Sequence, residues 1–403
     1  MLRAFLLLAL AASPAAAQRD PEKRQLIQLG ADKPLEGGPP IGYGFYYLNR
    51  PHLYMEDLTL RLVVAPVYMD SELGLSRIAP NTDLGIDLAG GGFAYGHNEI
   101  RHGTYVRGES FNGDGFSFGF SLYRILNPLQ RIPLYLVVRP MTSVQAFQSR
   151  STTDPNFQAP LDFQQSSLRL GGREPELGAT GLELSAWYEG QFRNRSQQYG
   201  FGGDRTVRQR SQLFWTRANF SYTFPDTGRY VYAGLTLGTS ADTDRLNAWR
   251  LGGQLPFTSE FPLAIPGYIQ DEIAARSFEH FEARWLTPLD RARQVGFGIW
   301  GVAAVVDYLP GFEQNGSLNS GLGAWGQFDS SAHNWRLGLL YGYGVTAVRS
   351  PGRGAHSVGL TVQFNIGPAT WPLPFEPGAP VERPRGALNP GVLSPLTPGK
   401  LIP

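Results

Sequence analysis

Alternation of apolar with polar or small residues is the dominant pattern of this chain of 403 residues. Large apolar side chains occupy every second position from Val358 to Ile366, and Ser, Gly, Thr, Gln and Asn stand between them. Successive side chains of a β-strand point to opposite faces, so this stretch predicts a strand with one apolar and one polar face. The face that points outward decides between a soluble protein and a membrane protein.

The same period of two recurs from about residue 41 to residue 367, without a convincing helical period. About fifteen strand candidates can be counted in this region, and a barrel whose two ends lie on the same side of a membrane needs an even number, so we expect 14 or 16 strands. The clearest alternating segments are residues 83–88, 116–122, 182–189, 219–224, 231–237 and 334–346.

The polar faces of these segments distinguish a barrel from a soluble sandwich. A sandwich exposes Lys, Glu and Thr, whereas these faces hold Gly, Ser, Asn, Arg and Glu, with almost no Lys. An outward apolar band between aromatic girdles, around a polar lumen, is typical of transmembrane barrels, whose strands must pair all their backbone groups. The predicted fold is therefore all-β, a transmembrane antiparallel β-barrel of about 14–16 strands. Aromatic residues stand at strand ends at Tyr46, Tyr47, Tyr222, Tyr308, Trp335 and Tyr343.

The composition agrees with a surface that alternates between apolar and polar. The chain has 49 glycines, 12% aromatic residues and only 17% charged residues. The absence of cysteine excludes disulfides, thiolate metal sites and a lipid-modified N-terminal cysteine. A net charge of +1 gives no case for nucleic acid as a partner. We expect no cofactor and no metal.

The chain divides into four predicted regions. Residues 1–17 have the charged start, apolar run and small-residue end of a signal peptide, so we expect a location in the bacterial outer membrane. Residues 18–40 are predicted to be a periplasmic leader and residues 41–367 the barrel. Residues 368–403 are too rich in proline to pair in a sheet and are predicted to be a disordered or extended tail. Short turns at 127–133, 287–293 and 329–334 suit the periplasmic side, and the long segments 147–177 and 255–274 suit the outer side.

The last strand candidate carries a first resemblance. Ser357, Gly359, Val362 and Phe364 match, in order, the polar–x–Gly–x–x–apolar–x–aromatic form of the terminal recognition strand of outer-membrane barrels. The resemblance implies that the barrel assembly machinery is a partner during biogenesis. The chain continues past Phe364 to Pro403, whereas a typical barrel stops at the aromatic residue.

A second resemblance covers residues 246–371. Leu251-Gly252-Gly253, Gly267-Tyr268, a Glu-x-Arg and an apolar-Asp pair follow one another as in the surface-antigen barrels of the outer-membrane assembly-factor and two-partner-secretion superfamily. The resemblance implies a long loop that folds back into the lumen and carries an Arg-Gly-aromatic tip, whose arginine pairs with an acidic residue of the wall. Here Pro266 stands where that arginine is expected. We also expect the barrel alone, without the periplasmic receiving domains of assembly factors.

These motifs supply the candidate site. The predicted loop tip is Pro266, Gly267 and Tyr268. A charge that faces lipid costs about 2–4 kcal/mol at the midplane for Arg or Lys, so charged strand residues are predicted to point inward. Without the tip arginine, Asp307 is expected to pair with Arg284, Arg336 or the Tyr268 hydroxyl. The plainer alternative is a solvated wall with no further role. The predicted lumen wall is Glu282, Arg284, Asp307 and Arg336.

An enzyme is not expected. None of the six histidines lies in a nucleophile motif, and the neighbours His356 and Ser357 face opposite sides of one strand. Residues 112–115, Asn-Gly-Asp-Gly, match only part of a calcium loop and are better read as a hairpin turn.

The predicted function is insertion or translocation of protein or lipid at the outer membrane. A passive porin-like channel for small solutes is the first alternative, and a barrel enzyme acting on lipid is the second. The expected partners are outer-membrane lipid and the assembly machinery, with a periplasmic partner left open.

Overall fold

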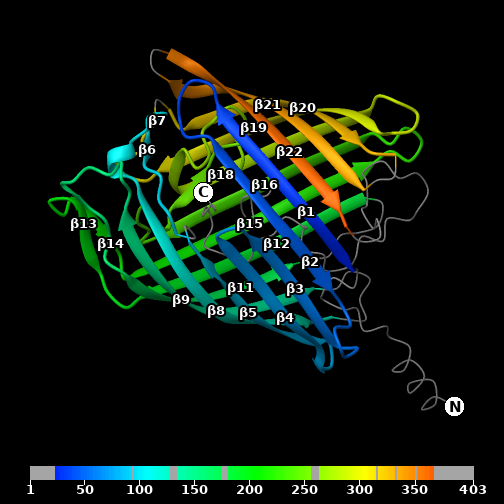
Figure 1. The fold of residues 1–403 in the computed structure, drawn as a ribbon, viewed down its shortest axis with the longest axis horizontal. Helices are drawn as coiled ribbons and strands as arrows, with labels where there is room; N and C mark the ends of the chain where they lie inside the picture. The colour runs from blue at the N-terminus through cyan, green and yellow to red at the C-terminus, as the bar shows by residue number, and fades with distance from the viewer. Residues whose placement is uncertain are drawn as a thin grey trace.

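The computed structural model describes residues 23–92, 95–127, 134–173, 180–255, 263–314, 316–331, 334–349 and 352–366. Within these ranges, sixteen long antiparallel strands form one closed barrel (Figure 1). This confirms the predicted fold class. The strands of the barrel are β1 (Arg24–Pro34), β2 (Ile41–Arg50), β3 (Leu58–Ala65), β4 (Tyr68–Ala79), β5 (Thr82–Gly91), β8 (Phe111–Ile125), β9 (Tyr135–Ser149), β11 (Phe163–Arg173), β12 (Thr180–Arg193), β15 (Arg210–Thr223), β16 (Tyr230–Ala241), β18 (Ile273–Pro288), β19 (Val295–Tyr308), β20 (Leu318–Asp329), β21 (Trp335–Arg349) and β22 (Gly352–Asn365).

Shorter elements lie in the connections between these strands. β17 (Trp249–Leu251) extends the barrel sheet by pairing with the start of β18. β6, β7, β13 and β14 gather at one end of the barrel (Figure 1). The remaining short elements are β6 (Ile100–Arg101), β7 (Thr104–Tyr105), the 3-10 helix η1 (Arg107–Glu109), β10 (Phe157–Gln158), β13 (Gln197–Phe201) and β14 (Arg205–Val207).

β1 closes the barrel by pairing with both β2 and β22, in a register that runs from Leu26 opposite Asn365 to Pro34 opposite Ser357. The prediction that residues 18–40 form a leader is therefore wrong for residues 24–34. Small residues weaken the alternation there, but a closed barrel needs a partner for the edge of β22, because an unpaired edge in lipid is costly. With this missed strand, the barrel has the even number of strands that was expected. Residues 1–17 and 368–403 lie outside the described residues.

The outward face of the strands is apolar. Leu339 on β21 is 58% exposed and Phe364 on β22 is 43% exposed, whereas Ser357 and Gln363 on the inward face of β22 are buried. The alternating faces of the last strand are thus apolar outside and polar inside, as in a barrel that spans a bilayer. In the described part of the chain, no helix is long and apolar enough to cross a membrane.

The two ends of the barrel differ in their connections. β1 begins and β22 ends at the same end, which also has tight turns such as the one between Ala79 and Thr82. The opposite end has the long connections 92–110, 150–162, 194–209 and 242–272. Short turns face the periplasm in barrels of this kind, so we call the two ends the periplasmic end and the outer end.

The segment 112–115 is part of β8. Asn112 lies opposite Gln148 and Asp114 lies opposite Ala146 in the pairing with β9. The expectation of a hairpin turn is therefore wrong, because the long partner strand continues the ladder through the two glycines.

Candidate functional site

One long connection turns back into the barrel. We call residues 252–272, of which 256–262 lie outside the described residues, the lumen loop. Its two arms are joined by backbone hydrogen bonds from Gly252 N to Leu263 O at 3.0 Å and from Ile265 N to Gly253 O at 2.9 Å. The side chains of Ile265, Tyr268 and Ile269 are completely buried. The described part of this loop is therefore packed inside the barrel.

The tip of the lumen loop lies against the backbone of β21 and β22. Gly267 has a φ of +80°, and a Cβ there would lie 1.9 Å from Gly344 N and 2.6 Å from Ala355 O. The Gly267 N–H donates to Ser357 Oγ at 3.2 Å. Only glycine suits this position, because both the conformation and the close approach exclude a side chain.

The neighbours of Gly267 hold the tip on β20 and β21. Pro266 packs on β20, where a Cβ on Gly321 would lie 2.4 Å from Pro266 O. The Tyr268 hydroxyl lies 3.0 Å from Thr346 Oγ1 and 3.3 Å from Asn319 Oδ1. The predicted tip residues therefore lie together, on the inner face of β20, β21 and β22.

Two polar contacts fix the loop at its base. The Glu272 carboxylate accepts hydrogen bonds from both terminal nitrogens of Arg349 on β21, at 2.7 and 2.8 Å, and both side chains are buried. Gln254 Nε2 donates to Asp32 Oδ1 of β1 at 2.7 Å. The resemblance implied an arginine on the loop and an acid on the wall. Here the acid is on the loop and the arginine is on the wall, so an ion pair is kept with its charges exchanged.

Three predicted wall residues face the lumen but do not touch the tip. Glu282 and Arg284 pair with each other on β18, and the Arg284 guanidinium lies 5.1 Å from the centre of the Trp300 ring. Arg336 pairs with Asp329 at the periplasmic end, with Nη2 3.1 Å from Oδ2. The tip instead lies near the outer half of the barrel. The expected pairing of Asp307 with Arg284 or Arg336 is absent from the described contacts.

Asp307 corrects the prediction most directly, because it points outward and not into the lumen. It pairs with Arg276 at 2.9 Å, and both side chains are about half exposed. The inward face of β19 is apolar, with Trp300, Val302 and Ala304 buried. The rule that polar residues point inward fails here because the wall packs against other protein and not water. Asp307 lies near the outer end of its strand, where a charge facing outward costs only about 0–1 kcal/mol.

The apolar inner wall was missed by sequence reasoning. Trp187 stacks on Trp215 at 6.0 Å, and Trp249 packs edge-on against Trp215 at 5.6 Å. The sequence nevertheless contained a signal for this wall. Trp187 lies on the same face of β12 as Glu183 and Glu189, and that face points into the lumen. This wall supports the lumen loop, since Tyr268 and Ile265 belong to the same buried cluster.

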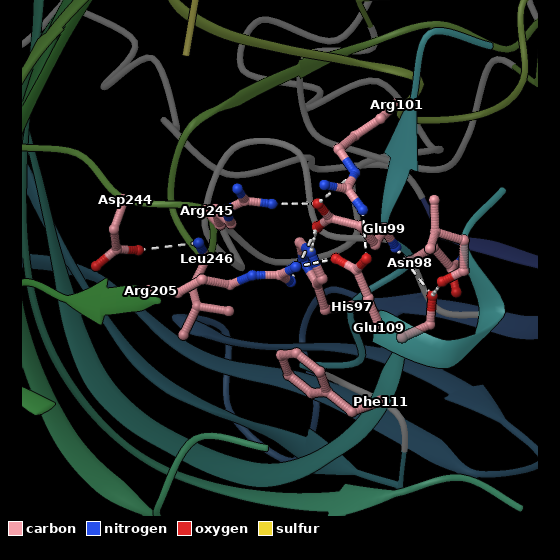
Figure 2. A network of polar contacts seen from close by, with 12 residues as sticks. His97, Asn98, Glu99, Arg101, Glu109, Phe111, Arg205, Asp244, Arg245 and Leu246 are labelled. Atoms are coloured by element: carbon pink, nitrogen blue, oxygen red, sulfur yellow. Dashed lines mark hydrogen bonds and ion pairs between the residues drawn. The ribbon is translucent and has the colours of Figure 1, made fainter. Parts of the chain in front are cut away.

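A second site lies among the loops of the outer end, and sequence reasoning missed it entirely. Glu99 is completely buried, and Figure 2 shows three arginines and His97 pointing toward it. His97 Nε2 lies 2.8 Å from its carboxylate, Arg101 Nε 3.4 Å and Arg205 Nη1 3.7 Å, and Arg245 is in direct contact. Glu109 contacts Arg101 and Arg205. We call His97, Glu99, Arg101, Glu109, Arg205 and Arg245 the mouth network.

Burial changes the proton affinity of the two central groups. Desolvation lowers the pKa of the His97 imidazole to about 4, and the charges of Arg250 and Arg245 act in the same direction. Burial alone would raise the pKa of the Glu99 carboxyl, but the hydrogen bond from His97 and the charges of Arg245 and Arg205 outweigh it and hold the pKa at about 2. At neutral pH, His97 is therefore uncharged and Glu99 is ionised.

An aromatic cluster lies beneath the mouth network. The His97 ring stacks on Phe111 at 5.2 Å, and Phe111 contacts Phe157 and Tyr199. The loops at the outer end are therefore packed like a protein core. Among the described residues, no group of three or more His, Asp or Glu side chains is placed to hold a metal ion.

Comparison with known proteins shows which solved structures share this architecture. No protein-family model and no curated protein sequence matches the chain. CdiB from Acinetobacter baumannii matches it with a TM-score of 0.57 at 11% identity, over 85% of this chain and 60% of that one. CdiB from Escherichia coli matches with a TM-score of 0.56 at 11% identity, over 85% of this chain and 63% of that one. The chain thus spans less than two thirds of either CdiB, and at this identity the likeness shows that it shares their barrel fold.

Proposed function

We propose that this chain is an outer-membrane barrel that takes part in the insertion or translocation of protein or lipid, with the lumen loop as the element that must move. The observation that carries the proposal is the loop itself, folded back and fixed to the inner wall at Gly267 and at Glu272. The motif resemblance supports the same class of function, and the barrel fold shared with CdiB agrees with it.

The apolar outer surface supports a location in the outer membrane with lipid as a partner. Leu184 and Leu339, both on the outward face, are among many exposed apolar side chains. The terminal strand β22 presents Gly359, Val362 and Phe364 in the order that the assembly machinery recognises in other barrels, so this machinery is proposed as a partner in biogenesis. We also propose that a periplasmic partner delivers the transported molecule to the barrel.

The two alternatives are less well supported. A passive pore needs an open path, whereas the lumen loop packs buried side chains inside the barrel and the mouth network packs them among the loops of its outer end. A lipid enzyme needs a paired nucleophile and base, whereas His356 lies on the outer face beside Tyr341 and Ser357 is buried on the inner face.

Single-channel recording in planar bilayers tests the moving loop. We expect small, flickering conductance from the intact chain and steady, large conductance when residues 263–272 are replaced by a short Gly-Ser linker. A steady, large conductance from the intact chain would favour the passive pore. Equal conductance of both proteins would show that the lumen loop does not control passage through the barrel.

A cargo experiment tests the function. In the native host, the gene is deleted and the proteins and lipids of the outer membrane and the medium are compared with the parent strain. Because the chain has no cysteine, the pair Tyr268→Cys and Thr346→Cys can be joined by a short bis-methanethiosulfonate cross-linker, which spans the space left by the tyrosine ring and is removed by a thiol reductant. We expect the locked protein to fail, and its reduced form to succeed, in restoring the depleted molecules. No depletion in the deletion strain would contradict the proposal.

A further inference from the structure

The mouth network joins three segments that lie far apart in the sequence. His97, Glu99 and Glu109 come from the connection between β5 and β8, Arg205 comes from β14, and Arg245 comes from the connection between β16 and β17. All three segments meet at the Glu99 carboxylate (Figure 2). One buried carboxylate therefore holds the loops of the outer end together.

The third segment leads directly into the lumen loop. Asp244, next to Arg245, contacts Arg193 of β12 and accepts hydrogen bonds from Arg208 N and Leu246 N at 2.8 and 2.9 Å. β17 and then the lumen loop follow within a few residues. Loosening the mouth network would therefore free the arm that leads into the lumen loop.

We propose that the mouth network is an acid-sensitive latch, which keeps the outer end of the barrel closed at neutral pH and releases it when His97 takes up a proton. The latch is independent of the proposed cargo, because a passive pore with the same loops would be gated in the same way.

The charges around His97 oppose a further positive charge. Arg101, Arg205, Arg245 and Arg250 are the cations of the site, and Arg245 and Arg250 both lie over the Phe312 ring, at 4.8 and 5.2 Å. Three carboxylates face these four arginines: Glu99, Glu109 and, beside Arg250, Asp271. The Tyr199 phenol completes the titratable groups. A buried imidazolium would enlarge this excess of positive charge, which costs free energy in a poorly solvated site.

The direction of the pH effect follows from linkage. In the closed mouth the pKa of His97 is about 4, and an exposed imidazole has 6.5. The open mouth therefore binds a proton that the closed mouth excludes, so opening becomes more favourable as the pH falls from 6.5 to 4. The Glu99 carboxyl, with a pKa of about 2 when closed, acts in the same direction only below pH 4.5. Burial raises the pKa of the Asp271 carboxyl to about 7 in the closed mouth, so release of Asp271 would oppose this effect. Its neighbour Glu272 is fixed to Arg349, so Asp271 keeps its surroundings when the mouth loops open. From pH 7.5 to pH 5, linkage at His97 then predicts an increase of about 30-fold in the opening equilibrium constant.

Single-channel recording of the full chain tests the latch. We expect the ratio of open to closed time to rise about 30-fold from pH 7.5 to pH 5. His97→Gln keeps a hydrogen-bond donor to Glu99 but cannot titrate, so it should stay closed at both values. Glu99→Gln should open at pH 7.5. His356→Gln, which removes a histidine on the outer face, should respond like the wild type. A pH-independent wild type, or a His97→Gln that responds like the wild type, would overturn the latch.

Hydrogen exchange on the wild type gives a test that needs no variant to fold. After correction for the chemical rate, residues 95–110 and 197–207 should exchange faster at pH 5 than at pH 7.5, while the barrel strands stay protected. Unchanged protection of these two segments would also overturn the latch.

Discussion

Glu272 of the lumen loop and Arg349 of β21 form a two-pronged ion pair inside the barrel, with N–O distances of 2.7 and 2.8 Å. Two parallel hydrogen bonds between a carboxylate and a guanidinium fix orientation as well as distance. Since both groups are buried, neither can be removed without leaving its partner desolvated. The pair therefore determines where the lumen loop rejoins the wall, in the role that the resemblance gave to a pair of opposite polarity.

Breaking this pair should cost much more stability than breaking an exposed one. Glu272→Gln or Arg349→Gln leaves an uncompensated buried charge, which costs about 3–5 kcal/mol. Unfolding by urea in lipid vesicles, followed by heat-modifiable gel mobility, measures the loss. Arg276→Gln, which breaks the half-exposed pair with Asp307, is the control and should cost less than about 1 kcal/mol. Equal losses in the two pairs would show that the Glu272 pair is solvated.

A side chain at position 267 should undock the tip without preventing the barrel from closing. In Gly267→Val the Cβ would collide with the backbone of Gly344 and Ala355, and the positive φ adds strain. We expect normal folding and a steady increase in single-channel conductance. Gly326→Ala is the matched control, because a Cβ there meets nothing within 4 Å. Unchanged conductance in Gly267→Val would mean that the tip does not obstruct the lumen.

Arginine on the outward face should impair assembly far more than arginine on the inward face. Leu184→Arg and Leu339→Arg place a charge in lipid, at a cost of about 2–4 kcal/mol near the midplane. Glu183→Arg lies on the opposite face of β12, toward the lumen. Folding yields into vesicles of defined lipid, read from gel mobility, compare the three variants. If all three fold equally well, the assignment of the two faces is wrong.

Proline in β1 should prevent closure. Ala31 lies opposite Gly42 of β2 and Leu360 of β22, so Ala31→Pro removes a donor from the strand that closes the barrel. We expect loss of the folded, heat-modifiable form. Ala31→Val keeps the N–H and adds an apolar side chain on the outward face, so it should fold like the wild type. Normal folding of the proline variant would show that residues 24–34 are not needed to close the barrel, as expected of a leader.

The sequence by itself determined the barrel and most of its outer surface. Alternation is a local property, so Leu184, Leu339 and the run from Val358 to Ile366 could be assigned to the outward face before any pairing was known. The tip at Gly267 was predicted from the resemblance to surface-antigen barrels, and the tight approach of backbone to wall explains why the residue is glycine.

What only the tertiary structure decided depends on partners that are distant in the chain. The weak alternation of β1 could be recognised as a barrel strand only from the structure, in which the edge of β22 needs a pairing partner. Asp307 points outward because the inner wall beside it packs against protein, which reverses the rule that holds for a water-filled lumen. Glu99 meets Arg205 and Arg245 across more than a hundred residues. A period of two carries no information about such contacts, because it fixes which face a side chain takes and not what lies opposite that face.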